Sequence, residues 1–199
     1  MQNYSPVAPD PDRSTLFSKV FSTFLDKFMY YFIFRGEKEK YMHWMGVKVG
    51  EGCQILNSVY GGYGSEPWLV EIGNRVTITN GVIFLTHDGA SRFFRDKIPG
   101  GSRYGNRFGR ILIHDECFIG TNTIIMPDVE IGPNSIVGVG SVVNKNVLPN
   151  MVYAGVPAKP ISTLDEYIER YKQKMIPISA TNRKDIREEL TKYFWGESR

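Results

Sequence analysis

The three histidines are the residues of this 199-residue chain best suited to acid–base chemistry near neutral pH. His87 belongs to the run Thr86-His87-Asp88-Gly89, at the start of a stretch, residues 88–109, that has no sequence period. An imidazole titrates near neutrality, and removal of a hydroxyl proton by such a group accelerates a reaction by roughly 10²- to 10⁴-fold. We therefore expect His87 to be a general base. We expect Asp88 to be a supporting residue that orients the imidazole or binds a hydroxyl group, although consecutive side chains of an extended backbone point apart.

The other two histidines have less distinctive positions. His114 directly follows the apolar residue Ile113, at a point where related segments carry glycine, so we expect it at a backbone corner and keep it as the competing candidate. His43 is most simply a packing or surface residue.

The element that must position these residues is a repeat of apolar side chains every six residues. The apolar positions are Ile113, Ile119, Ile125, Ile131, Val137 and Val143. Four residues after each comes a small or β-branched side chain, namely Cys117, Thr123, Val129, Ser135, Ser141 and Val147. A period of six fits neither a helix nor one long strand, so it predicts short strands separated by regular turns. Such hexapeptide repetition is typical of a parallel β-helix, in which each rung buries its apolar row against its neighbours.

Glycine follows the apolar residue in three of these units, at Gly120, Gly132 and Gly138. It suggests a backbone corner that a Cβ atom would crowd. The alternative is chance spacing in a β-rich domain.

Two irregular stretches interrupt the repeat, which begins at Val49. We interpret residues 57–68 as a turn or as a rung distorted to shape a site. Residues 88–109 form a long loop rich in arginine, glycine and aromatic residues, and loops of this length are usually functional. We divide the chain into an N-terminal segment (1–45), a β-helix domain (46–161) and a C-terminal helical extension (162–199).

Helices are expected at both ends. The apolar run at residues 20–34 is interrupted by Asp26 and Lys27, so it predicts a packing helix rather than a membrane span. Its aromatic residues leave attachment to a membrane surface as an alternative. Near the C-terminus, Thr163 with Glu166 predicts the start of one helix that Pro177 stops, and Asn182 predicts the cap of another.

The composition and charge distribution limit the kinds of ligand and the cellular compartment that we expect. The net charge is +3, with lysine and arginine mixed among aspartate and glutamate, so we expect no nucleic-acid stripe, while a local pocket for an anionic ligand is compatible with the pattern. Cys53 and Cys117 both occupy the small position of a repeat, and we interpret them as reduced core residues of a cytosolic protein. The polar, proline-rich start of the chain has no pattern of a cleavable signal.

Residues 119–161, IGTNTIIMPDVEIGPNSIVGVGSVVNKNVLPNMVYAGVPAKPI, resemble the closing signature of the hexapeptide-repeat acyltransferases. With VKVGEGCQI before them and FLTHDG at 84–89, the chain is similar in particular to the polysaccharide and sugar O-acetyltransferases. The resemblance implies a mainly β fold, a left-handed parallel β-helix, and a homotrimer that binds acetyl-CoA in the groove between subunits. The implied reaction is acetyl transfer to a hydroxyl group of a sugar or polysaccharide precursor.

The resemblance also assigns site residues. It makes His87 the catalytic histidine, and it implies a cofactor site at Thr121, Gly138, Val139, Gly140, Asn144, Lys145 and Lys159. The backbone near Gly138 would face the pantetheine arm, and the two lysines would meet phosphates. The chain departs from the family pattern at Val139, Asn144 and Asn146, although Asn144 keeps a polar side chain, and these changes weaken individual contacts more than the family assignment.

Two other functions remain open. A β-helix can serve as a non-catalytic scaffold, and the related γ-type carbonic anhydrases bind zinc with three histidines. Here the histidines are 44 and 27 residues apart in sequence, without a closely spaced pair, so we expect no metal. Acceptor specificity should lie in the irregular stretches 57–68 and 88–109.

Overall fold

The computed structural model describes residues 27–58, 62–100 and 105–196. The chain divides into two compact units, Met1–Leu164 and Asp165–Arg199. The first unit contains the repeats and the second contains the C-terminal helices.

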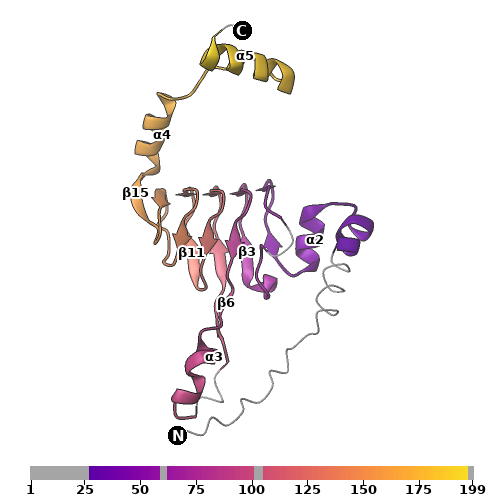
Figure 1. Cartoon of the computed structure of the whole chain (residues 1–199), viewed down its shortest axis with the longest axis vertical. Helices are drawn as coiled ribbons and strands as arrows, with labels where there is room; N and C mark the ends of the chain where they lie inside the picture. The colour runs from indigo at the N-terminus through magenta and orange to yellow at the C-terminus, as the bar shows by residue number, and fades with distance from the viewer. Residues whose placement is uncertain (1–26, 59–61, 101–104, 197–199) are drawn as a thin grey trace, which may run out of the picture. The chain divides into compact units, whose positions relative to one another are not determined.

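The repeats form a parallel β-helix with three faces, as the six-residue period predicted, and it is left-handed, as the family resemblance implied (Figure 1). Face A contains β1 (Lys48–Val49), β3 (Val70–Ile72), β8 (Ile111–Ile113) and β11 (Val129–Ile131). Face B contains β2 (Gln54–Ile55), β4 (Thr77–Ile78), β9 (Phe118–Ile119), β12 (Ile136–Val137), β14 (Met151–Ala154) and β15 (Lys159–Thr163). Face C contains β5 (Ile83–Phe84), β10 (Ile124–Ile125) and β13 (Val142–Val143). All pairs on these faces are parallel except β14 with β15.

The apolar row of the repeat is the core. Ile125 pairs in register with Phe84 on one side and with Val143 on the other, and all three side chains are buried. The small position four residues later is buried too, and its polar members bond to backbone carbonyls. Ser135 Oγ donates to Leu148 O at 2.9 Å, and Cys117 Sγ donates to Gly132 O at 3.0 Å. Small side chains fit here because they fill little of the core, and the polar ones find a hydrogen-bond acceptor in the backbone. Both cysteines are free thiols.

The corners between faces have two distinct requirements. A Cβ atom on Gly120 would lie 2.6 Å from Val139 N, which confirms that the position after the apolar residue is crowded. Three residues after the apolar residue, the backbone is left-handed, with φ of 58° at both Glu116 and Asn122 and 62° at Asp128. This second position has no single residue type in the sequence, because glycine, asparagine, aspartate, glutamate and arginine all occupy it.

A helix covers the first rung of the β-helix, and an extra strand pairs with the last strand of face B. The helix α2 (Lys38–Trp44) buries Tyr41 and Met42 in the core at the first rung. Lys38 Nζ donates to the carbonyl oxygens of Ile55 and Asn57, at 3.1 and 3.2 Å. The helix therefore begins within the charged run at 37–40, directly after the break at Gly36, which has a φ of 77°. At the other end, β15 pairs antiparallel with β14, so the final parallel strand does not present an open edge.

The first part of the predicted helix over 20–34, residues 20–26, lies outside the described residues. The described part is helical from residue 27 and contains the five-residue π-helix η1 (Met29–Ile33). No helix within the described residues is long and apolar enough to cross a membrane.

The first interruption of the repeat is a distorted rung. Phe84 N donates to Gly62 O at 2.7 Å, and the rings of Tyr63 and Phe84 stack with centroids 5.0 Å apart. Tyr63 therefore takes the place of the missing apolar residue on face C, and the short 3-10 helix η2 (Pro67–Leu69) returns the chain to β3.

The second interruption leaves the β-helix as a two-stranded ribbon. The strand β6 (His87–Asp88) pairs antiparallel with β7 (Arg107–Phe108), and the chain between them includes α3 (Ser91–Phe94) and the 3-10 helix η3 (Arg95–Lys97) (Figure 1). The loop expected at 88–109 is thus partly helical.

The second unit contains the two expected helices, α4 (Leu164–Lys172) and α5 (Arg183–Trp195). The predicted cap is confirmed, because Asn182 Oδ1 accepts a hydrogen bond from Asp185 N at 3.0 Å. Gly196 ends α5 with a φ of 75°. The helix α4 ends at Lys172, before Pro177 is reached.

We expect Gly120→Ala to lower the free energy of unfolding by about 1–3 kcal/mol, because the added methyl group would overlap backbone atoms of the next rung that cannot rotate away. Urea denaturation measures this change. Gly89→Ala is the matched control, since its Cβ would have no atom within 4 Å. Equal stability losses in the two variants would contradict this account of the corners.

Candidate active site

His87 lies at the corner where face C meets face A. It comes three residues after Phe84 of β5, and there the chain leaves the β-helix. The chain returns when Gly109 N donates to Thr86 O at 2.9 Å. The imidazole is 31% exposed, so a small molecule can reach it while the surrounding rungs hold its backbone.

The imidazole contacts Glu66, a residue that sequence analysis did not single out. His87 Nδ1 lies 2.8 Å from Glu66 Oε2, and Thr86 Oγ1 donates to the same oxygen at 2.7 Å. The Glu66 side chain is only 16% exposed. The one available sequence signal was the irregular stretch 57–68 itself, which was expected to shape a site.

The electrostatics of this pair favour an ionised carboxylate. Burial acts to raise the pKa of the Glu66 carboxyl, but hydrogen bonds from Thr86 and His87 and the charge of His87 outweigh it, so the pKa is lower than usual. A carboxylate accepts hydrogen bonds only, so we assign the proton of the neutral imidazole to Nδ1. Within the described residues, Nε2 has no hydrogen-bond partner, and its lone pair can accept a proton.

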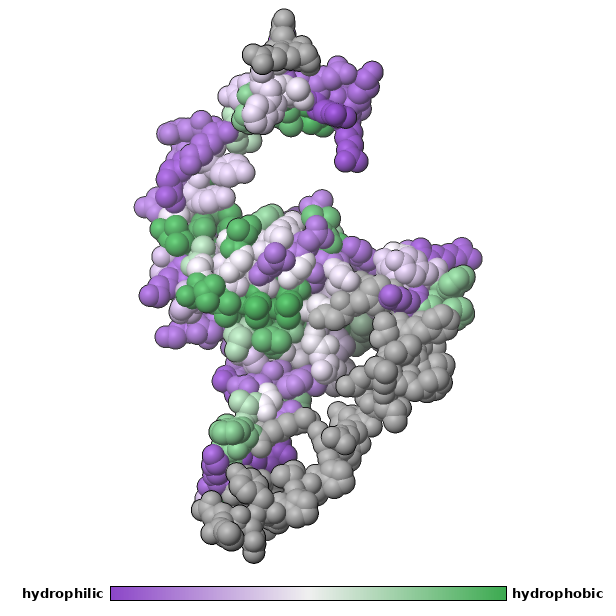
Figure 2. All heavy atoms as spheres, viewed as in Figure 1, coloured by the Kyte–Doolittle hydropathy of each residue, from purple (hydrophilic) through white to green (hydrophobic). Residues whose placement is uncertain are grey.

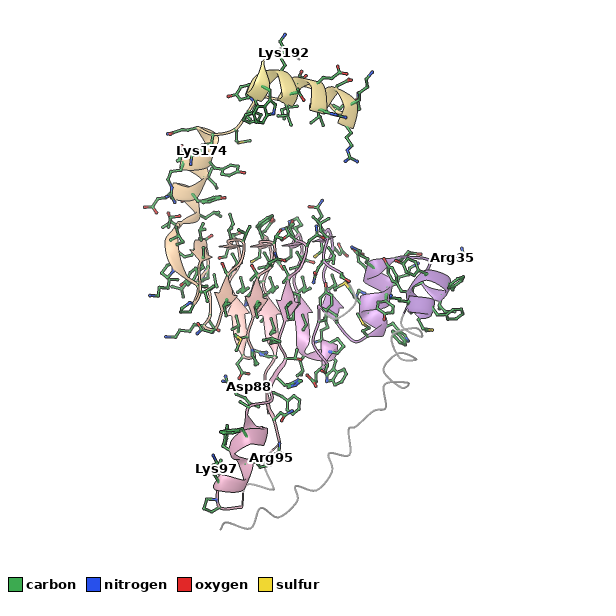
Figure 3. All side chains as sticks on the ribbon, viewed as in Figure 1. Arg35, Asp88, Arg95, Lys97, Lys174 and Lys192 are labelled. Atoms are coloured by element: carbon green, nitrogen blue, oxygen red, sulfur yellow. The ribbon has the colours of Figure 1, made fainter. Side chains whose placement is uncertain are left out.

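The surroundings of His87 are aromatic on one side. Phe108 faces His87 across the β6–β7 ribbon, with ring centroids 5.6 Å apart, and it is 52% exposed. Asp88 lies where the chain leaves the β-helix, and its Oδ1 accepts a hydrogen bond from Ala90 N at 2.8 Å (Figure 3). It thus holds the turn of the loop, and Glu66 rather than Asp88 contacts the imidazole.

The residues expected to bind the cofactor lie on the two edges of face C. Thr121, Gly138, Val139 and Gly140 lie at the corner between faces B and C, in successive rungs. Lys159 pairs with Ala154 beside this same edge. By contrast, Asn144 and Lys145 follow β13 on the edge that carries His87, two rungs away from it. Both lysines are exposed.

The remaining histidines lie elsewhere. His114 follows β8 at the corner between faces A and B, as expected, and His43 Nδ1 contacts Glu39 O at 2.8 Å within α2. In the described part of the chain, no group of three or more histidine, cysteine, aspartate or glutamate residues could hold a metal ion.

Comparison with known sequences gives a consistent picture. Residues 110–145 match a family described as bacterial transferase hexapeptide (six repeats). CapG of Staphylococcus aureus is 43% identical over 123 residues, which make up 62% of this chain and 69% of CapG. Galactoside O-acetyltransferase of Escherichia coli K12 is 29% identical over 153 residues, 68% of this chain and 72% of that protein. The bifunctional protein GlmU of Rubrobacter xylanophilus is 32% identical, but this chain spans only 22% of its length.

Solved structures share the fold. A hexapeptide-repeat acetyltransferase of Vibrio cholerae in complex with acetyl-coenzyme A has a TM-score of 0.54 at 19% identity, and the match covers 77% of this chain and 92% of that one. Galactoside acetyltransferase in complex with coenzyme A has a TM-score of 0.53 at 21% identity, covering 86% and 93%.

The depressed pKa of Glu66 predicts a pH-dependent contribution to stability. A carboxyl group whose pKa is lower in the folded chain stabilises the fold above its unfolded-state pKa, and this stability is lost as the pH falls through the folded pKa. Glu66→Gln should therefore lower the free energy of unfolding near neutral pH, and the deficit should shrink as the pH falls from about 5 to about 3.

Urea denaturation across this range provides the measurement. Glu116→Gln, which removes an exposed carboxylate paired with Arg75, is the control for general acid effects. A Glu66→Gln deficit that stayed constant with pH would be inconsistent with an ionised Glu66.

Proposed function

Because the chain belongs to the hexapeptide-repeat acyltransferases, we propose that it transfers an acetyl group from acetyl-CoA to a hydroxyl group of a sugar or polysaccharide precursor. The observation that carries this proposal is His87, a partly exposed imidazole with a carboxylate at Nδ1 and an available lone pair at Nε2. The name of galactoside O-acetyltransferase supports a sugar hydroxyl as the acceptor.

In the proposed reaction, Nε2 of His87 removes the acceptor hydroxyl proton as the oxygen attacks the thioester carbonyl carbon. A new C–O bond forms and the carbonyl electron pair moves onto oxygen, where a backbone N–H holds the negative charge. The carbonyl then re-forms, the C–S bond breaks, and the imidazolium returns its proton to the departing thiolate. The products are the acetyl ester and free coenzyme A.

The edge between faces B and C suits the cofactor. Gly140 has a φ of 65° and no atom within 4 Å of where its Cβ would lie, so its backbone is open to a ligand. Thr121, Gly138 and Val139 share this edge, and Val139 is largely exposed. Backbone groups at such an open glycine can approach a pantetheine arm closely. Asn144 would add a polar contact, and the exposed cations Lys145 and Lys159 would bind phosphates as point charges.

Phe108 supports a sugar acceptor. Its half-exposed ring lies beside His87 and offers an apolar surface for one face of a pyranose, while the sugar hydroxyls remain free to reach Nε2. The two described arginines next to Phe108 already have acidic partners, since Arg107 pairs with Asp128 and Arg110 with Glu130. We therefore infer an acceptor recognised mainly by stacking and hydrogen bonds.

We also infer a homotrimer, from the chemistry of the outer faces. On face C the outward side chains Ile83, Ile124 and Val142 pair in register, which makes an apolar row. On face A the outward positions include Lys48 and Glu71, which form an ion pair at 3.0 Å. Figure 2 shows apolar side chains gathered over part of the β-helix surface. A neighbouring subunit that covers face C would also enclose both of its edges, and with them His87 and the cofactor residues.

The free thiols of Cys53 and Cys117 agree with a reducing compartment, and we infer that the enzyme acts in the cytoplasm.

His87→Ala should lower kcat by at least about 100-fold and leave the affinity for acetyl-CoA within about twofold, because the imidazole acts mainly in the transition state. Thiol release from acetyl-CoA in the presence of a panel of sugars, including a galactoside, measures turnover.

His114→Ala is the matched control and should keep near-wild-type turnover. Lys159→Ala should instead weaken acetyl-CoA binding by about tenfold with a smaller effect on kcat, as expected for a lost contact to phosphate. If His114→Ala abolished turnover and His87→Ala did not, the general base would be His114.

Light scattering should give the mass of a trimer at micromolar concentration, and Ile124→Glu should dissociate it, because a buried unpaired charge is costly. Gln54→Glu, an exposed change on face B, should leave the trimer intact. A wild-type protein that is a stable monomer would refute the assembly.

A further inference from the structure

We propose that Glu66 is a positioning residue of the reaction, which fixes the tautomer and orientation of His87 while Thr86 anchors the carboxylate. This inference rests on the proposed function, because it presupposes that His87 is the general base. It assigns a role to the irregular stretch 57–68, which the repeat alone does not explain.

The placement of Glu66 follows from the distorted rung. Tyr63 stacks on Phe84, so these two residues occupy equivalent positions in successive rungs of face C. Glu66 comes three residues after Tyr63, and His87 comes three residues after Phe84. The two side chains therefore leave the β-helix at the same corner, one rung apart. Their contact is built by the rungs and does not require the long loop.

A glycine makes this close approach feasible. A Cβ atom on Gly64 would lie 2.5 Å from Thr86 Oγ1 and 2.9 Å from Phe84 O. Gly64 also has a φ of 67°, which most residues rarely adopt. The chain can thus pass directly against Thr86 and bring the Glu66 carboxylate onto the imidazole.

Thr86 adds a second constraint on the carboxylate. Its side chain is buried, with 1% exposure, and its hydroxyl donates to the same Oε2 atom that contacts His87 Nδ1. A carboxylate that one buried donor already holds cannot rotate freely. It therefore presents a fixed acceptor to the imidazole, which leaves Nε2 aimed outward.

Other carboxylates near this corner are engaged elsewhere. Asp88 accepts from Ala90 N, and Asp128 pairs with Arg107 at 3.1 Å. Among the described residues, Glu66 is the carboxylate in hydrogen-bond contact with His87. Such a contact stabilises the imidazolium that forms as the hydroxyl proton is taken, and it disfavours the tautomer with its proton on Nε2.

The decisive variant is Glu66→Gln, which keeps the shape and an acceptor oxygen but removes the charge. We expect kcat to fall by about 10- to 100-fold, while KM for acetyl-CoA stays within about twofold. The acid limb of the kcat/KM profile should move to lower pH, since the imidazolium loses its stabilising carboxylate. A purely structural role of Glu66 would not shift this limb.

Thr86→Val tests the hydrogen bond that anchors Glu66 separately from the negative charge of Glu66. It removes the hydroxyl but leaves the carboxylate, so we expect a smaller loss of kcat with the acid limb unmoved. Glu116→Gln, which removes an exposed carboxylate from an equivalent corner position on another edge, should have wild-type kinetics.

A second measurement does not depend on turnover. Because the chain has only three histidines, nitrogen NMR of the ¹⁵N-histidine-labelled protein can resolve His87, assigned by its loss in His87→Ala. We expect the Nδ1–H tautomer in the wild type, and a population of the Nε2–H tautomer in Glu66→Gln, whose amide group can donate to Nδ1. An unchanged tautomer and an unchanged turnover in Glu66→Gln would overturn the proposal.

The outcomes also separate the two proposals. If His87→Ala loses turnover but Glu66→Gln does not, His87 is the base and Glu66 does not position it. If His87→Ala keeps wild-type turnover, the proposed mechanism fails, and with it the role of Glu66 in catalysis, even where NMR still detects the contact.

Discussion

The parallel register between rungs is the constraint on which the rest of the molecule depends. Each buried apolar side chain pairs with the equivalent side chain one coil away, as Ile125 does with Phe84 and Val143. Because a slip of one residue would turn an apolar row outward, the core fixes the register strictly. The corners are then aligned as well, and residues far apart in the sequence meet in columns along each edge of the β-helix.

The candidate site uses these columns. The first irregular stretch keeps the stacked rows intact because Tyr63 completes its rung, and the second does so because it leaves and re-enters the β-helix at a corner. Glu66 belongs to the first stretch and His87 directly precedes the second, and both lie at the corner between faces C and A. The cofactor candidates divide between this corner and the next, on either side of the apolar face C. The proposed base, its positioning residue and the cofactor candidates thus all lie along the two edges of face C.

Burial separates the groups that act on protons from those that bind charge. The carboxylate of Glu66 is mostly shielded from solvent and holds two hydrogen bonds, so its effect on the imidazole is strong. Lys145 and Lys159 are exposed, where charges are well solvated and screened. Exposed lysines are suited to bind a ligand with several phosphate groups. A shielded carboxylate is suited to hold the imidazole of His87, the proposed proton acceptor, in one orientation.

The sequence by itself determined the β-helix, because an apolar residue every six positions can be buried only by coiling, and it located His87 at the break in that order. It also determined the cap at Asn182, since capping depends on residues close in the chain. Only the tertiary structure decided that Tyr63 completes a rung, that Lys38 begins a capping helix, and that Glu66 rather than Asp88 meets the imidazole. Those contacts join residues separated by an irregular segment, and no local pattern encodes a distance that is set by how whole rungs stack.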